Sequence, residues 1–252
     1  MFDLSLELTL FLIGAAFLAG FVDSIAGGGG LITVPALLLT GMDPVTALST
    51  NKLQGSFGSG TACWHYASRG LVDLRTQVWP ALAALATSVA GASLVTSLPT
   101  DTLKIGLPVL LIAVALFFAL KPGLGDQDRH TRLSPLALTL TAVPAIGFYD
   151  GLLGPGAGSF YMIALILLAG QGVLKATAHT KLLNFASNVG SLGFFALAAP
   201  PLWATGIAMG LAQVAGARLG AGLAIRNGAG IIRPLLVVTS TALALRLIWQ
   251  YW

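Results

Sequence analysis

Residues 182–217 read LLNFASNVGSLGFFALAAPPLWATGIAMGLAQVAGA and contain no Asp, Glu, Lys or Arg. Since about 20 apolar residues carry a helix across the hydrocarbon core of a bilayer, this stretch is too long for one span. Pro200-Pro201 interrupts it near the middle, where a proline breaks the helical hydrogen bonds. The stretch therefore predicts two transmembrane helices joined by a short turn.

The rest of the chain has the same character. Uncharged stretches also cover 76–100, 133–149 and 151–174, and only 9% of the 252 residues are charged, against about 25% in soluble domains. So little charge cannot cover a water-exposed surface of this size. The net charge of +4 is scattered, with no basic stripe that would indicate nucleic-acid binding. We predict an all-α polytopic protein that crosses the plasma or inner cell membrane several times.

The apolar pattern predicts about 8 full transmembrane helices, near 5–22, 45–67, 75–97, 102–121, 134–150, 176–198, 202–224 and 232–251. Two shorter apolar segments, 31–41 and 158–170, each follow a glycine-rich break. Residues 1–7 contain no Lys or Arg, so we expect the first apolar run to be a retained helix instead of a signal peptide.

Three sequence blocks recur in the same order, which indicates an internal duplication. The matches are Phe21-Val22-Asp23 with Phe148-Tyr149-Asp150, Ala47–Leu53 with Ala176–Leu182, and Val89–Leu94 with Val214–Leu219. We therefore divide the chain into a first transmembrane repeat, 1–121, a polar linker, 122–133, and a second repeat, 134–252.

The basic loops give the orientation of these repeats. Lys and Arg concentrate at 69–75, 121–132 and 226–233, which the positive-inside rule places in the cytoplasm. The three loops lie on the same side of the membrane only if each short segment, like its neighbouring helices, crosses the membrane. Each half then has an odd number of crossings, which predicts inverted repeats with both termini outside. If the short segments are re-entrant, the repeats are parallel instead.

The glycine-rich breaks are the first candidate site. Four glycines at 27–30, and Gly154-Pro155-Gly156 in the other half, interrupt helices inside apolar sequence. Broken backbone at membrane depth must be buried in protein or line a cavity, and paired breaks build the substrate sites of transporters. Close helix packing through small residues is the alternative. Because the breaks occupy matching positions, we predict that they meet near the bilayer midplane and bind an anion through free N–H groups.

Ionisable residues near the breaks are the second candidate. Asp23 and Asp150 could carry a proton, pair with a lysine or cap the short helix that follows. Lys52 and Lys181 could bind the substrate or extend to the membrane surface. Arg218 lies in an apolar stretch and could contact an anion or pair with an aspartate.

Polar residues beside the lysines complete the candidate site. Asn51 precedes Lys52, and Thr180 and Asn184 lie on the helix that carries Lys181, so polar side chains run into otherwise apolar helices. His179 could titrate near neutral pH or serve only as a hydrogen-bonded packing residue.

Enzymatic motifs are missing from the sequence. It has no HExxH, no Gly-x-Ser-x-Gly and no Walker lysine loop, its three histidines are dispersed, and Cys63 is the one cysteine. Asp23 and Asp150 do not directly follow Gly-x-Gly, as an intramembrane aspartyl protease requires. We expect no catalytic residues, metal or cofactor.

Several segments resemble the sulfite exporter TauE/SafE family of membrane transporters. The resemblance covers nearly the whole chain and is carried by 20–35 (GFVDSIAGGGGLITVP), 47–52, 70–75, 147–151, 154–156 and 216–219. Members of this family are described as exporters of sulfite or transporters of sulfoacetate and other sulfur-containing anions. The resemblance implies a transporter more firmly than it implies sulfite. His179-Thr180 stands where the first half has Thr50-Asn51, so the two half-sites are chemically unequal.

Our hypothesis is a secondary transporter, and an exporter in direction, that moves sulfite or an organosulfonate by alternating access. A membrane scaffold or assembly factor would instead lack a polar cavity between the halves, and an intramembrane hydrolase would need the two aspartates in contact. The expected partners are a small anion and the lipid bilayer. The expected substrate contacts are Gly27, Gly28, Gly29, Gly30, Asn51, Lys52, Gly154, Gly156, Gly158, Thr180, Lys181, Asn184 and Arg218, with Asp23, Asp150 and His179 as candidates for proton coupling.

Overall fold

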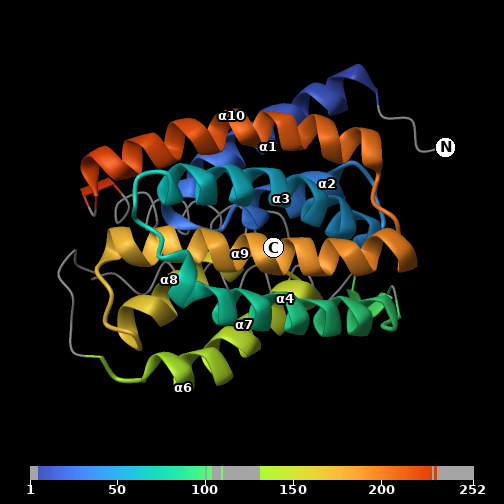
Figure 1. The fold of residues 1–252 in the computed structure, drawn as a ribbon. Helices are drawn as coiled ribbons and strands as arrows, with labels where there is room; N and C mark the ends of the chain where they lie inside the picture. Colours follow the sequence, from blue (N-terminus) through green and yellow to red (C-terminus); the bar gives the residue numbers. More distant parts are fainter. Residues whose placement is uncertain (1–4, 100, 104–108, 110–130, 229, 232–252) are drawn as a thin grey trace.

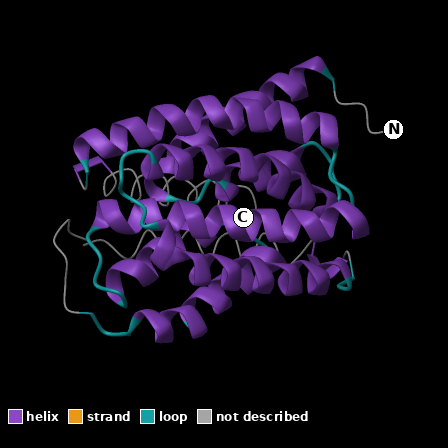
Figure 2. Ribbon diagram, in the orientation of Figure 1, coloured by secondary structure: helices purple, strands orange, loops and turns teal. Residues whose placement is uncertain are grey.

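The computed structural model describes residues 5–99, 101–103, 109, 131–228, 230 and 231. These residues form helices and loops, with no strand among them (Figures 1 and 2). The helices are α1 (Leu6–Ala26), α2 (Gly30–Leu39), α3 (Pro44–Ala67), α4 (Leu74–Thr96), α6 (Pro135–Leu140), α7 (Ala142–Leu152), α8 (Ala157–Leu167), α9 (Val173–Ala198) and α10 (Trp203–Asn227).

Helices occupy the predicted ranges that the structure describes, whereas the total of about 8 transmembrane helices stays a prediction. One difference is the expected helix at 134–150, which is divided into α6 and α7 at Thr141, where φ is −125° and ψ is −81°. Among the residues that the structure describes, four stretches are long and apolar enough to cross a membrane, namely α1, α4, 135–152 and α10. The helices expected at 102–121 and 232–251 lie outside the described residues, apart from 102, 103 and 109.

Capping side chains set where several helices begin. The carboxylate of Asp43 accepts a hydrogen bond from the Thr46 N–H (3.0 Å), and the Ser134 hydroxyl accepts one from the Ala137 N–H (3.2 Å). A proline follows each cap at the first helical position, where its missing N–H costs nothing. These local signals explain why the starts of α3 and α6 were predictable to within a residue.

The two halves of the chain interlock. Figure 1 shows α3 and α9 in the middle, with α1 and α10 on one side and α4, α6 and α7 on the other. Helix α10 of the second half packs against α1 and α3 of the first half, and α4 of the first half packs against α7 and α9 of the second. Each half therefore supplies a helix that the other half needs.

Close contacts define the helix directions. Gly216 and Gly220 of α10 approach Phe17 and Phe21 of α1, in the same order along both helices, so these two helices run parallel. The central helices α3 and α9 run antiparallel, because Gly55 lies beside Asn188 and Gly60 beside Phe185.

Small residues permit the closest approach of helices. A Cβ atom added at Gly151 would lie 1.9 Å from the carbonyl oxygen of Ser88, and one added at Gly216 would lie 2.0 Å from that of Phe17. The pairs α4–α7 and α1–α10 thus use the packing through small residues that is typical of membrane helices. This close packing involves Gly151 and Gly216, which lie outside the glycine-rich breaks at 27–30 and 154–156.

We predict that Gly151→Ala lowers the stability of the purified protein, because a methyl group cannot fit against the α4 backbone. Overpacking of this kind costs about 1–3 kcal/mol, which a lower thermal unfolding temperature in detergent would report. The matched control is Gly193→Ala in α9, where an added Cβ meets nothing within 4 Å. Equal unfolding temperatures for the two variants would show that the close contact does not determine stability.

Candidate functional site

The two glycine-rich breaks meet inside the protein. Gly27 and Gly28 follow α1 with φ of +79° and +87°, and Gly154 and Gly156 follow α7 with φ of +90° and +84°, a conformation that favours glycine. The Ser159 hydroxyl donates a hydrogen bond to the Ala26 carbonyl (3.0 Å), which joins one break to the other. The prediction that the breaks approach each other is confirmed, and their placement at the bilayer midplane stays a prediction.

Two buried ion pairs cross between the halves. The Lys52 ammonium lies 2.5 Å from the Asp150 carboxylate, and that of Lys181 lies 3.1 Å from the Asp23 carboxylate. Each ammonium also donates to the main-chain carbonyl of the same aspartate. Lys52 is 1% exposed and Lys181 0%, so neither lysine extends to the membrane surface. The aspartates pair with lysines, which was one of the three roles expected for them.

The second carboxylate oxygens differ between the pairs. Asp23 Oδ1 accepts the Gly29 N–H (3.0 Å) just before α2, so this aspartate also caps the short helix. Asp150 Oδ2 instead accepts the hydroxyl of Ser187 on α9. Asp23 is 14% exposed and Asp150 only 2%, which makes the two half-sites unequal in access as well as in chemistry.

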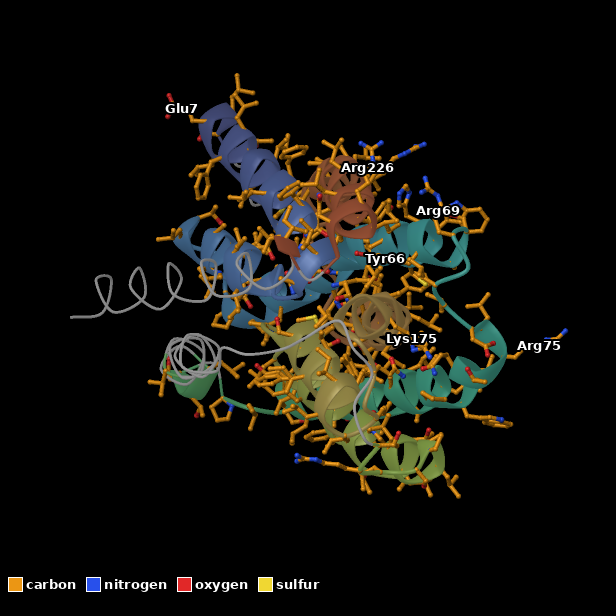
Figure 3. All side chains as sticks on the ribbon, turned by 90° about the vertical axis from the view of Figure 1, so that its left-hand side faces the viewer. Glu7, Tyr66, Arg69, Arg75, Lys175 and Arg226 are labelled. Carbon is orange, nitrogen blue, oxygen red and sulfur yellow. The ribbon has the colours of Figure 1, made fainter. Side chains whose placement is uncertain are left out.

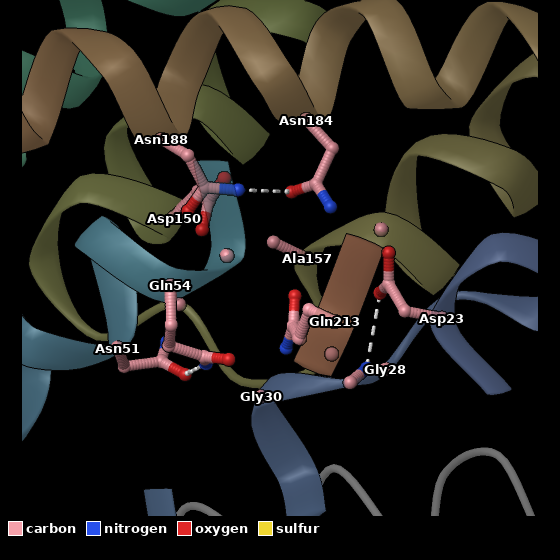
Figure 4. A pocket seen from close by; sticks show the side chains of 15 residues that line it. Asp23, Gly28, Gly30, Asn51, Gln54, Asp150, Ala157, Asn184, Asn188 and Gln213 are labelled. Atoms are coloured by element: carbon pink, nitrogen blue, oxygen red, sulfur yellow. Dashed lines mark hydrogen bonds between the residues drawn. The ribbon is translucent and has the colours of Figure 1, made fainter. Parts of the chain in front are cut away.

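A polar cavity of about 30 Å³ lies where the breaks and the aspartates meet (Figure 4). A cavity of this size holds on the order of two water molecules or one compact ion. It is lined by Asp23, Gly28, Gly29, Gly30, Asn51, Gln54, Gly55, Asp150, Gly154, Gly156, Ala157, Gly158, Asn184, Asn188 and Gln213.

Most of the expected residues line this cavity, and sequence reasoning missed two glutamines. Gln54 lies one helical turn after Asn51, and Gln213 is the single glutamine in the uncharged stretch 182–217. Asn188, one turn after Asn184, was also left out of the expected set. An amide spaced one turn from an expected site residue was the signal that could have identified Gln54 and Asn188.

Other expected residues lie elsewhere. Lys52 and Lys181 contact the aspartates and do not line the cavity, and Gly27 packs against Ser159. Thr180 is buried, and its hydroxyl has no hydrogen-bond partner among the described residues. Arg218 is exposed on α10, because its position on the helix turns it away from the cavity.

His179 belongs to a second, larger cavity of about 440 Å³ at one end of the molecule. Its Nδ1 lies 2.9 Å from the Gln171 side-chain oxygen. Lys175 also lines this cavity, and Figure 3 views the molecule from the end where Lys175, Arg69, Arg75 and Arg226 lie. Leu183 lines this cavity while its neighbour Asn184 lines the central one, so the two cavities lie on either side of α9.

A helical membrane protein whose discontinuous helices meet at a buried polar cavity has the architecture of secondary transporters. The family model described as "Sulfite exporter TauE/SafE" matches residues 12–247, and the chain belongs to this family of membrane transporters.

Relatives match nearly the whole chain. It is 57% identical to "Probable membrane transporter protein ORF9" of Sinorhizobium sp over 98% of this chain and 95% of that protein. It is 45% identical to "Probable membrane transporter protein YfcA" of Escherichia coli K12 over 93% and 87%, and 40% identical to a "Probable membrane transporter protein" of Haemophilus influenzae over 98% and 97%. No solved structure matches the chain.

We predict that Lys52→Met strongly destabilises the protein, because it leaves the Asp150 charge buried and unpaired. Removing one partner of a buried ion pair costs about 3–5 kcal/mol. Adding Asp150→Asn removes the orphaned charge, so the double variant should unfold at a higher temperature than Lys52→Met alone. The same cycle at Lys181 and Asp23 should give a smaller loss, because Asp23 is partly exposed. Additive effects of the two substitutions would contradict the pairing.

Proposed function

We propose that the chain is a multi-pass secondary transporter of the cell membrane that exports a small sulfur-containing anion, such as sulfite or an organosulfonate, through the central cavity. The observation that carries the proposal is the start of two helices, α2 and α8, at the same polar cavity. The first N–H groups of a helix have no intrahelical partner and carry partial positive charge, so each start favours an anion. The small cavity volume favours a compact anion.

The charged side chains around the cavity are compatible with a bound anion, because they form two ion pairs with no net charge. Lys52 neutralises Asp150 and Lys181 neutralises Asp23, so neither carboxylate repels the ligand with its full charge. The anion then takes its hydrogen bonds from glycine N–H groups other than that of Gly29, which donates to Asp23, and from the amides of Asn51 and Asn184. Both lysines act on the substrate through the aspartates that they hold.

The packing at the two ends supports alternating access. Equivalent helices point in opposite directions, since α3 and α9 are antiparallel, as inverted repeats require. The larger cavity lies at the end with His179, whereas the opposite end holds an apolar cluster of Leu12, Ala16, Ala36, Leu37, Met42, Ala47 and Met209. We infer that this conformation faces the basic, cytoplasmic end.

Cysteine labelling tests this direction of access. In a Cys63→Ser background, Gln77→Cys in the larger cavity should react with a membrane-impermeant thiol reagent added from the cytoplasmic side. Met42→Cys in the apolar cluster is the control and should stay unreactive from either side, because it is buried. If the Met42→Cys variant reacted and the Gln77→Cys variant did not, the proposed direction of access would be wrong.

The two alternatives are less well supported. A scaffold was expected to lack a polar cavity between the halves, and the structure has one. A hydrolase was expected to bring the two aspartates into contact, whereas each aspartate is bonded to a lysine of the other half.

The transport proposal is tested with purified protein in liposomes, by flux and binding of sulfite, thiosulfate, sulfoacetate and taurine. We expect at least one of these to be bound and moved. Asn184→Leu should weaken its binding about 10- to 100-fold, because a hydrogen bond to a charged group is lost. Asn227→Leu, at the exposed end of α10, is the matched control and should change nothing. Absence of binding and flux for all four compounds would refute the proposal.

We further propose that Asp23 and Asp150 link transport to protons. Protonation of an aspartate would release its lysine and allow the halves to separate. Asp23→Asn should therefore remove the pH dependence of flux while largely preserving substrate binding, and Asp150→Asn should act similarly but with a greater loss of stability. Full pH dependence in both variants would exclude the aspartates, and the same assay on His179→Gln would then test the remaining candidate.

A further inference from the structure

We infer that the ligand of the central cavity carries a hydrogen-bond donor as well as its negative charge, and that the side-chain carbonyl of Gln54 accepts this donor. The inference rests on the proposed function and narrows the class of substrate.

Gln54 is held rigidly by its amide nitrogen. It lies on α3, is 1% exposed, and donates from Nε2 to Asn51 Oδ1 (2.7 Å) and Thr33 Oγ1 (3.0 Å). The Thr33 hydroxyl donates in turn to Asn51 Oδ1 (2.6 Å). In this arrangement Asn51 Oδ1 receives both donors, so the amide nitrogen of Gln54 faces the network and its oxygen faces the other way.

The carbonyl oxygen of Gln54 is left without a partner. It is buried, accepts no hydrogen bond from any described residue, and points into the cavity in Figure 4. A buried acceptor that receives no hydrogen bond is destabilising, so a donor from outside the chain is expected at this position. The lysine ammonium groups do not supply it, since both are bonded to aspartates.

The cavity therefore presents two kinds of group to one compact ligand. The N–H groups at the starts of α2 and α8 suit anionic oxygens. Gln54 suits an O–H or N–H group on the same molecule. Hydrogen sulfite combines these features, whereas thiosulfate, sulfate and simple alkanesulfonates carry no donor at neutral pH. A site that hydrogen-bonds a ligand group strongly rejects an analogue of the same shape that lacks it.

Sulfamate and methanesulfonate test the inference, because they have nearly the same size and charge and differ in an amino group against a methyl group. We expect the wild-type protein to bind sulfamate at least about 10-fold more tightly than methanesulfonate by calorimetry. Gln54→Met should bring this ratio close to one, mainly by weakening sulfamate binding. Gln213→Met, which removes another cavity amide, should shift both affinities alike and keep the ratio.

Each outcome decides the question. Equal wild-type affinities for the two anions would overturn the inference while leaving anion transport intact, and this comparison needs no variant. A preference for sulfamate that survives in folded Gln54→Met would assign the acceptor to another group or to a bound water, and would also overturn it. Failure of the protein to bind any sulfur-containing anion would instead refute the proposed function.

Discussion

The crossed ion pairs are the constraint on which the rest of the site depends. A charged side chain inside a membrane protein is tolerated only when it is paired and hydrogen-bonded. Each lysine meets this requirement twice, since its ammonium contacts both the carboxylate and the main-chain carbonyl of one aspartate. The Asp150 carbonyl belongs to the last turn of α7, where helices leave carbonyl groups without partners, whereas the Asp23 carbonyl in the last turn of α1 also accepts the Gly27 N–H (2.9 Å). Each ammonium therefore neutralises a carboxylate and donates to a carbonyl at the end of a helix.

The glycines follow from this constraint. A Cβ atom at Gly154 would lie 2.8 Å from the Lys52 ammonium nitrogen, and one at Gly29 would lie 2.8 Å from Asp23 Cβ. Glycine has no Cβ atom, so it lets the chain turn beside the ion pair and begin the next helix within a few residues. The broken helices, the small cavity and the N–H groups directed at it are thus consequences of one arrangement, which each half completes for the other.

Much of this arrangement could be predicted from sequence, because its signals are local. Helix spans follow from uncharged stretches, the breaks from glycine, and the duplication from blocks such as Ala47–Leu53. Which lysine meets which aspartate could not be predicted, since that depends on how two halves far apart in sequence pack. The exposed position of Arg218 was missed for a related reason. In a helix that is apolar all round, the pattern does not indicate which face turns inward.

The two halves contribute different side chains to the cavity, so its two sides differ chemically even though the helices around it are duplicated. On the first half, Thr33, Asn51 and Gln54 form a closed network that leaves one acceptor free. On the second half, Thr180 occupies the position of Asn51 in the repeat and makes no comparable network among the described residues. A symmetric ion would gain nothing from such a difference, because it presents the same group in every direction. A ligand with unlike groups at its two ends binds in one orientation only. Divergence at these few positions can therefore change substrate choice while the ion pairs and glycines that build the cavity stay fixed.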